Sequence, residues 1–105
     1  MLEVRTYTLA SEEALEQYAT VHWARHIASL AKYGITTHHV WREVGGDRPH
    51  LIAVVEYEAD ADPRAVTEAY MTSAEFRDDM DGFEMSGIQG VSSVFVEAAS
   101  SDPST

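Results

Sequence analysis

The chain alternates between strand-like and helix-like stretches, and the order of these stretches restricts its fold more than any other feature. Apolar alternation and short apolar runs predict strands over residues 2–9, 35–44, 51–58 and 89–98. Helical spacing predicts one helix from Ser11 to Tyr33 and a second helical region over residues 64–71 and 74–80. The order βαββαβ favours an α+β domain with one four-stranded antiparallel sheet and both helical regions on one face.

Local signals mark where the helices begin and end. Ser11 is a suitable N-cap for the first helix, and Gly34 is suited to the position just past its C-terminus. Asp62 and Pro63 form the expected entrance to the second helical region. Ser73 is the expected N-cap of its second piece.

The length and charge of the chain limit its organisation and its partners. A chain of 105 residues fits one domain, which we place at residues 1–98, with a polar and disordered tail at 99–105. The net charge is −11, and the seven basic residues are scattered. Nucleic acids and anionic membrane surfaces are therefore not expected partners, because both need clustered Lys and Arg.

The chain has no cysteine, so disulfides and thiolate chemistry are excluded. The first residues do not resemble a signal peptide, and no apolar run approaches the length of a membrane span. These features predict a cytoplasmic protein. The sequence also lacks a glycine-rich phosphate loop and a nucleophile elbow, which argues against phosphoryl transfer and covalent acyl chemistry.

The third expected strand predicts self-association. Its run from Leu51 to Val55 is apolar at every position, so both faces of the strand need cover. Helices on one face of a four-stranded sheet leave the other face open. A second copy of the chain would cover it, and we expect a homodimer that forms through the sheet face.

The first predicted helix carries two histidines in its apolar stripe. At about 100° per residue, one arc collects five residues: Leu15, Ala19, His22, His26 and Leu30. Trp23 and Ile27 lie on one side of this arc, and Tyr18 lies on the other. A buried imidazole needs hydrogen-bond partners, so two of them one turn apart point to a pocket between this helix and the sheet.

Three interpretations of His22 and His26 remain open. Either imidazole is suited to moving protons near neutral pH, which favours general acid–base catalysis. The i, i+4 spacing also suits a metal ion, with His38 or Glu56 as a third ligand. This pattern lacks the three or four evident ligands of a zinc site, and we expect no metal. The third interpretation is that both rings are ordinary core residues whose hydrogen bonds are satisfied by the protein.

Other residues are candidates for the same pocket. Tyr7 shares a strand face with Arg5 and donates a hydrogen bond beside the imidazoles if that face meets the helices; otherwise both belong to a dimer interface. Arg25 either orients an oxyanion or forms a surface ion pair. His38 and His39 point to opposite faces, so only one can join the pocket. The remaining ligand-binding candidates are aromatic or apolar, and ordinary packing is their alternative role: Tyr18, Trp23, Trp41, Phe76 and Met80.

Several short motifs resemble the NIPSNAP family of the dimeric α+β-barrel superfamily. They are Glu3–Leu9 at the first strand, Lys32-Tyr33-Gly34, Trp41, Val55-Glu56-Tyr57, Ser73–Phe76 and the last strand, Ser93–Glu97. The resemblance implies a ferredoxin-like fold that dimerises sheet against sheet. Related barrels include cofactor-independent monooxygenases, lactone isomerases, polyketide cyclases and haem-binding enzymes. Their ligands often lie between the sheet and the helices of one protomer. The pair His38-His39 and the methionine-rich loop depart from many relatives.

We therefore expect a cofactor-independent enzyme that acts on a small apolar or aromatic molecule by isomerase, cyclase or monooxygenase chemistry. His22 or His26 would move the proton, and Tyr7 or Arg25 would stabilise an oxyanion. The alternative is a dimer that binds a small hydrophobic molecule, or haem through an axial imidazole, without catalysis. A purely structural or partner-binding dimer is the third class.

Overall fold

A computed structural model describes residues 1–104 of the chain. Its elements, in order, are β1 (Leu2–Leu9), α1 (Glu12–Gln17), the π-helical η1 (Tyr18–His22), α2 (Trp23–Lys32), β2 (Thr36–Arg42), β3 (His50–Glu56), α3 (Pro63–Met71), α4 (Ala74–Asp79), the 3₁₀ turn η2 (Met85–Gly87) and β4 (Ile88–Val96). The predicted βαββαβ order is confirmed. The long first helix is divided into three segments, and the second helical region into two.

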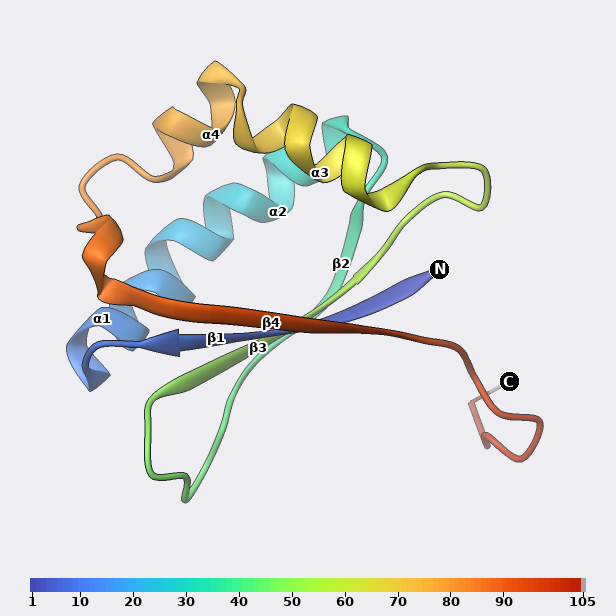
Figure 1. Cartoon of the computed structure of the whole chain (residues 1–105), viewed down its shortest axis with the longest axis horizontal. Coiled ribbons are helices and arrows are strands. Elements are labelled where there is room, and N and C mark those ends of the chain that lie inside the picture. Colours follow the sequence, from blue (N-terminus) through green and yellow to red (C-terminus); the bar gives the residue numbers. More distant parts are fainter. Residues whose placement is uncertain (105) are drawn as a thin grey trace.

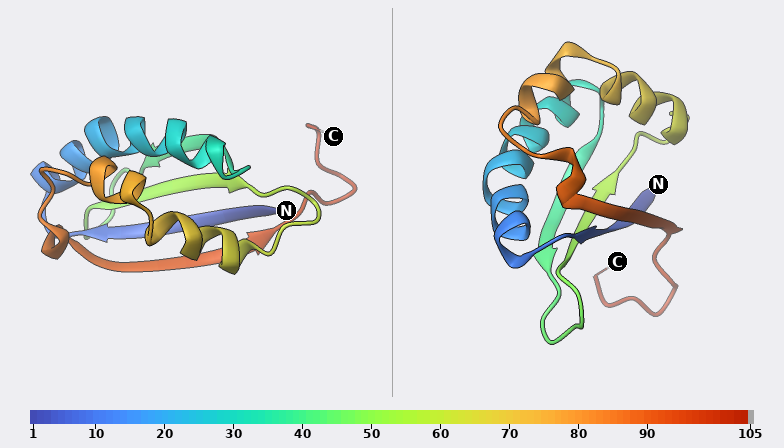
Figure 2. Two further views of the ribbon diagram at one scale, coloured as in Figure 1. Left: turned by 90° about the horizontal axis from the view of Figure 1, so that it is seen from above. Right: turned by 60° about the vertical axis from the view of Figure 1, so that its left-hand side comes forward.

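The four strands form one antiparallel sheet in the order β2-β3-β1-β4 (Figure 1). Strand β1 lies in the middle, where Tyr7 pairs with Leu51 of β3 and with Val91 of β4. The helices all lie on one side of this sheet (Figure 2). The sheet and the placement of the helices confirm the expected ferredoxin-like α+β architecture.

Burial along the strands shows which face of β1 meets the helices. Glu3, Tyr7 and Leu9 are buried, whereas their neighbours on the other face are partly exposed. The buried positions of β3 alternate in the same way: Leu51, Ala53 and Val55 are buried. They pair with residues of β1 on the face that carries Glu3 and Tyr7. The side chain of Tyr7 therefore points toward the helices, which resolves the alternative that its sequence pattern left open.

A π turn changes the predicted face of the first helix. The N–H of Trp23 bonds to the carbonyl of Tyr18, five residues earlier, so one extra residue enters that turn. As a result, adjacent His22 and Trp23 are both buried, at 0% and 1% exposure. Ile27, which the wheel of a regular helix placed on one side of the stripe beside Trp23, is 44% exposed. Ala19, placed at the centre of the predicted stripe, is only partly buried.

The helix ends follow the local signals. Ser11, Asp62 and Ser73 each accept a hydrogen bond from a backbone N–H in the first turn of the helix that follows. Gly34 adopts a φ of 78° just after α2. A side chain is disfavoured in that conformation, so glycine is suited to reversing the chain toward β2.

The face of the sheet without helices remains open in the single chain. Its exposed apolar residues include Val94 at 59% and Trp41 at 50% exposure, and the rings of His39 and Trp41 stack with centroids 4.2 Å apart. The register of β2 against β3 shifts between Thr37 and His39. Because His38 lies at this irregularity, both histidines of β2 are exposed.

The chain beyond β4 carries neither helix nor strand in its described part, residues 97–104, and it extends past the end of the sheet (Figure 1). The last position of the predicted tail, 105, lies outside the described residues. Within residues 1–104, every helix is too short or too polar to cross a membrane. The cytoplasmic location stays a prediction.

Candidate functional site

A small cavity lies between the sheet, α2 and the α3–α4 region. Its volume is about 150 Å³, which matches an apolar cavity that accommodates one benzene ring. The walls are mainly aromatic and apolar, with a few polar groups among them. The lining residues are Arg5, Tyr7, Tyr18, Trp23, His26, Leu30, Thr67, Tyr70, Met71, Phe76, Met80, Met85, Ile88 and Val91.

His26 is the histidine that lines this cavity, and its orientation is fixed by two other side chains. The Tyr70 hydroxyl donates to Oδ2 of Asp79 at 2.5 Å, and Nδ1 of His26 contacts the same hydroxyl oxygen. Tyr70 has one proton to donate, so His26 carries its proton on Nδ1 and donates it to Tyr70. The Nε2 atom is therefore the unprotonated nitrogen of the ring.

Burial keeps the imidazole of His26 neutral. Loss of hydration lowers its pKa to about 4, and Asp79 opposes this shift only in part. Oδ2 of Asp79 lies 3.7 Å from Nδ1, so it is close enough to stabilise the ring when the ring gains a proton. Burial and the hydrogen bond to Asp79 raise the pKa of Tyr70, which keeps its hydroxyl protonated.

Hydrogen-bond donors gather on the sheet side of the cavity. Nη1 of Arg5 donates to the Tyr7 hydroxyl at 3.3 Å, and burial raises the pKa of Tyr18 so that its hydroxyl keeps its proton. Trp23 is 1% exposed, and within residues 1–104 its indole Nε1–H faces the Tyr18 hydroxyl without completing a hydrogen bond. A buried N–H without a partner costs about 1–3 kcal/mol, so a ligand oxygen that accepts from it would be stabilised.

Arg5 is anchored by a polar network at the edge of the cavity. Its Nε donates to Glu3 at 2.8 Å, and its Nη2 donates to the Tyr57 hydroxyl at 2.8 Å. Tyr57 in turn donates to Glu3 at 2.6 Å and contacts Thr67 of α3. Burial alone would raise the pKa of Glu3, but the hydrogen bonds from Tyr57 and Arg5 lower it, so the carboxylate stays ionised. The charge of Arg5 is thus balanced within the protein.

His22 and Arg25 lie apart from the cavity and serve the chain after α4. His22 is fully buried, with Nδ1 at 2.8 Å from the Asp79 carbonyl and Nε2 at 3.1 Å from the Gln17 side-chain nitrogen. Both ring nitrogens are therefore satisfied by the protein. Arg25 donates to the carbonyls of Asp79 and Asp81, at 3.2 and 3.1 Å. It forms no part of the cavity wall.

The structure also separates the two candidates on β2 from the rest. Nε2 of His38 lies 2.7 Å from Oε1 of Glu56 at the exposed side of the sheet. Trp41 stacks on His39 at the open face. Neither His38 nor Trp41 lines the cavity. Five predicted residues besides His26 do line it: Tyr7, Tyr18, Trp23, Phe76 and Met80.

Tyr70 and Asp79 were missing from the predicted site. Tyr70 belongs to the apolar pattern of α3, so the sequence indicated a packing residue. Asp79 lies at the end of α4 among acidic neighbours, and nothing local distinguishes it from a solvated carboxylate. Its burial, with 7% of the residue exposed, is the signal, and that signal exists only in the folded chain.

The geometry bears on cofactors in two ways. Within residues 1–104, no three or more His, Asp or Glu side chains gather in an arrangement that could hold a metal ion. A haem macrocycle is several times larger than one benzene ring, so the cavity beside His26 does not fit haem. The lining residues instead suit a small ring with one or two polar oxygens.

Comparison with solved structures confirms the fold. A NIPSNAP domain protein from Burkholderia xenovorans superposes with a TM-score of 0.75 at 15% identity, covering 97% of each chain. A dimeric ferredoxin-like protein from an uncultured marine organism gives 0.58 at 18% identity, covering 93% of this chain and 96% of the other. An antibiotic biosynthesis monooxygenase gives 0.56 at 14% identity, with coverages of 94% and 99%.

The sequence comparisons identify the family. No curated protein matches this chain. The family model for NIPSNAP, by contrast, matches residues 2–102, which span the whole sheet and every helix described above. The chain therefore belongs to the NIPSNAP family.

Proposed function

We propose that this protein is a cofactor-independent enzyme that removes a proton from a small cyclic or aromatic molecule carrying a carbonyl or hydroxyl oxygen. The observation that carries the proposal is the neutral imidazole of His26, which lines a ring-sized cavity and has its Nδ1 committed to the Tyr70–Asp79 pair. His22 has no part in it, because both its nitrogens are bonded to the protein.

The proposed step is an enolisation. Nε2 of His26 takes a proton from the carbon next to the substrate carbonyl, so that the C–H bond breaks and an N–H bond forms. The electron pair moves to the carbonyl oxygen, which becomes an enolate. General-base removal of a substrate proton is the step that the proposal covers, whichever of isomerase, cyclase or monooxygenase chemistry follows it.

Two sets of residues would stabilise the charges that develop. Arg5, Tyr7 and the partnerless N–H of Trp23 are the donors available to the enolate oxygen. On the other side, the protonated His26 would be held through Tyr70 by Asp79, whose charge favours the imidazolium. Tyr70 and Asp79 are thus positioning residues, because they act on the substrate only through His26.

Hydrogen–deuterium exchange tests this step directly. Cyclohexanone is a suitable probe, because it is a six-membered ring with enolisable hydrogens, and its exchange in D₂O is followed by NMR. We expect the wild-type protein to accelerate exchange and His26→Gln to lose about 100-fold of that acceleration. His50→Gln is the matched control, because His50 pairs with Glu43 outside the cavity. Equal rates for the two variants would refute a role for His26.

Binding without turnover is the second candidate, and the pKa of His26 favours it. A base with a pKa near 4 is weak, although its neutral form is fully populated at neutral pH. A dimeric carrier or sensor for a small hydrophobic molecule needs only the cavity and its hydrogen-bond donors. Saturable binding of cyclohexanone with exchange no faster than in buffer would favour this function over catalysis.

We also propose that the protein is a homodimer that buries the open face of the sheet. Val4, Val54 and Val94 lie side by side on that face by the strand register, and Val94 is 59% exposed. Contiguous apolar residues on a soluble chain favour self-association. The structural neighbour described as a dimeric ferredoxin-like protein supports self-association of this fold.

A further inference from the structure

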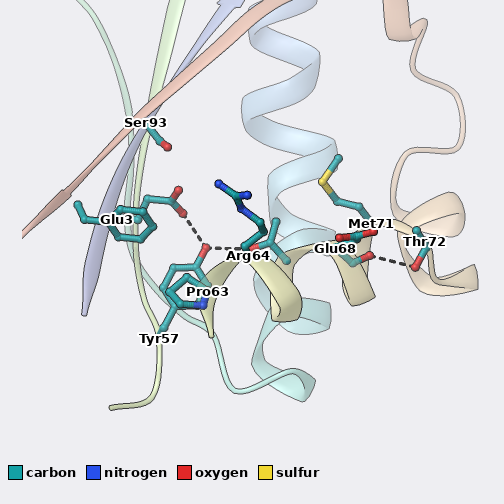
Figure 3. A pocket seen from close by; sticks show the side chains of 10 residues that line it. Glu3, Tyr57, Pro63, Arg64, Glu68, Met71, Thr72 and Ser93 are labelled. Atoms are coloured by element: carbon teal, nitrogen blue, oxygen red, sulfur yellow. Dashed lines mark hydrogen bonds between the residues drawn. The ribbon is translucent and has the colours of Figure 1, made fainter. Parts of the chain in front are cut away.

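A second hollow adjoins the cavity, along the groove between α3 and β4. Figure 3 shows Glu3 and Ser93 on the strand side and residues of α3, such as Arg64 and Met71, on the other. Its volume is about 610 Å³, within the range of ordinary ligand sites. Its residues are Glu3, Tyr57, Pro63, Arg64, Thr67, Glu68, Met71, Thr72, Ser93 and Phe95. We call it the α3 groove.

The α3 groove and the cavity adjoin one another. Thr67 and Met71 line both of them, so the two spaces meet along one face of α3. The polar network of Arg5, Glu3 and Tyr57 lies at the same border and satisfies its own charges. A ligand that passes this border therefore meets a neutral ion pair rather than an unbalanced charge.

Exposed apolar side chains line the path outward. Met71 is 54% exposed and Phe95 is 52% exposed, and both line the α3 groove. Large apolar groups left open beside a pocket are a recognised mark of a binding surface. The charged residues facing the groove are Glu3, Arg64 and Glu68, of which Glu3 is already paired with Arg5.

The volumes indicate how a ligand would divide between the two spaces. The cavity, at about 150 Å³, has room for one six-membered ring and little else. Most ligand sites have volumes of about 300–1,000 Å³, so a substrate of ordinary size would extend beyond the cavity. The α3 groove is the space that continues from it at Thr67 and Met71.

We infer that the natural ligand has two parts: a single ring with a polar oxygen, which occupies the cavity, and an apolar chain, which lies in the α3 groove against Met71 and Phe95. This inference rests on the proposed function only in placing the ring beside His26. It requires binding and no particular reaction. It also commits the α3 groove to the ligand, rather than to a second copy of the chain.

Two phenols that differ only in a chain test the inference. Phenol and 4-butylphenol share the ring and hydroxyl, and only the second has a chain for the groove. The protein has two tryptophans, so Trp41→Phe leaves Trp23 as the reporter inside the cavity. We expect 4-butylphenol to bind about tenfold more tightly than phenol, because about half of its four added carbons would be buried.

Glu68→Phe, made in the same background, places a ring in the α3 groove and leaves the cavity wall unchanged, since Glu68 is exposed on α3 and lines only the groove. We expect this variant to bind phenol as before and to lose the tenfold gain from the butyl chain. Unchanged phenol binding shows that the variant has folded. Equal affinities of the two phenols for the Trp41→Phe protein, as expected if a second copy fills the groove, would overturn the inference. An equal loss of both phenols in Glu68→Phe would do the same.

The outcome is separable from that of the proposed function. A tenfold gain in affinity from the butyl chain, together with no accelerated deuterium exchange of cyclohexanone, supports ligand binding in the α3 groove and contradicts the catalytic role of His26. Deuterium exchange that depends on His26, without any gain in affinity from the butyl chain, supports catalysis and contradicts the role of the α3 groove in binding.

Discussion

Nδ1 of His26 lies 3.7 Å from Oδ2 of Asp79, and the Tyr70 hydroxyl bonds to both groups. The three residues come from α2, from α3 and from the end of α4. This hydrogen-bonded link therefore joins the helices to one another as well as orienting the imidazole. The same three groups should therefore contribute to the free energy of unfolding, and they determine which nitrogen of His26 carries the proton.

Removing the Tyr70 hydroxyl tests the structural part of this link. Tyr70→Phe leaves the Asp79 carboxylate and Nδ1 of His26 buried without their shared partner. We expect a loss of about 1–3 kcal/mol in the free energy of unfolding, measured by urea denaturation. Tyr33→Phe is the matched control, since within residues 1–104 the Tyr33 hydroxyl bonds to Glu75 alone, at a partly exposed site. Its removal should cost much less. A similar loss in both variants would contradict the proposed importance of the link.

Stability should depend on pH through His26. Its pKa is about 4 in the folded chain, against 6.5 for a freely hydrated imidazole, so the unfolded chain binds more protons between these values. Stability therefore rises with pH across this window, and it falls as the solution is acidified from pH 7. We expect His26 to account for a loss of about 2 kcal/mol between pH 7 and pH 5.

Urea denaturation of His26→Gln at both pH values isolates this contribution. The variant lacks the titrating ring, so its stability should change less between pH 7 and pH 5 than that of the wild type. His50→Gln should retain the wild-type dependence, because His50 is partly exposed and lies, like its partner Thr8, on the face of the sheet away from the helices. An unchanged dependence in His26→Gln would show that other groups cause the acid sensitivity.

Much of the architecture follows from local sequence signals. Ser11, Asp62 and Ser73 act through hydrogen bonds to the next few residues, so their positions determine where helices begin without reference to the rest of the chain. The alternation of β1 likewise predicted that Tyr7 and Leu9 share a face. Which of its faces meets the helices depends on pairing with β3 and β4, and that information is not local.

The site was predictable only where one element carries the signal. His26 and Trp23 belong to the stripe of the first helix, and the stripe placed both near a pocket. The π turn at Tyr18–His22 rotates this stripe and was not predictable from spacing. Asp79 reaches His26 only because α4 folds back over α2, so its role depends on tertiary packing. His38 was misplaced for the converse reason, since an irregularity in β2 leaves it at the surface.

The two tryptophans allow a matched test of the donors in the cavity. Trp23→Phe removes the indole N–H that lacks a partner, whereas Trp41→Phe changes a residue on the opposite side of the sheet. We expect Trp23→Phe to weaken phenol binding about five- to thirtyfold, from the loss of one buried hydrogen bond worth about 1–2 kcal/mol. Calorimetric titration should show Trp41→Phe binding phenol like the wild type. Unaltered affinity in Trp23→Phe would mean that the ligand oxygen lies elsewhere.

The proposed dimer makes opposite predictions for two valines of β4. Val94 is 59% exposed on the open face of the sheet, and Val91 is 57% exposed on the face that meets the helices. A lysine at either position adds the same charge to the same strand. If the open faces pack together, Val94→Lys buries a charge in the interface and should give a monomer, whereas Val91→Lys should leave the dimer intact.

Light scattering coupled to size-exclusion chromatography measures the mass of each variant directly. A monomeric wild-type protein at micromolar concentration would contradict the dimer, and so would a dimeric Val94→Lys. A monomer produced only by Val91→Lys would instead place the interface over β4 on the helix side, beside the mouth of the α3 groove. In that case the butyl chain and a second copy would compete for the same apolar surface. The affinity for 4-butylphenol would then fall as protein concentration rises.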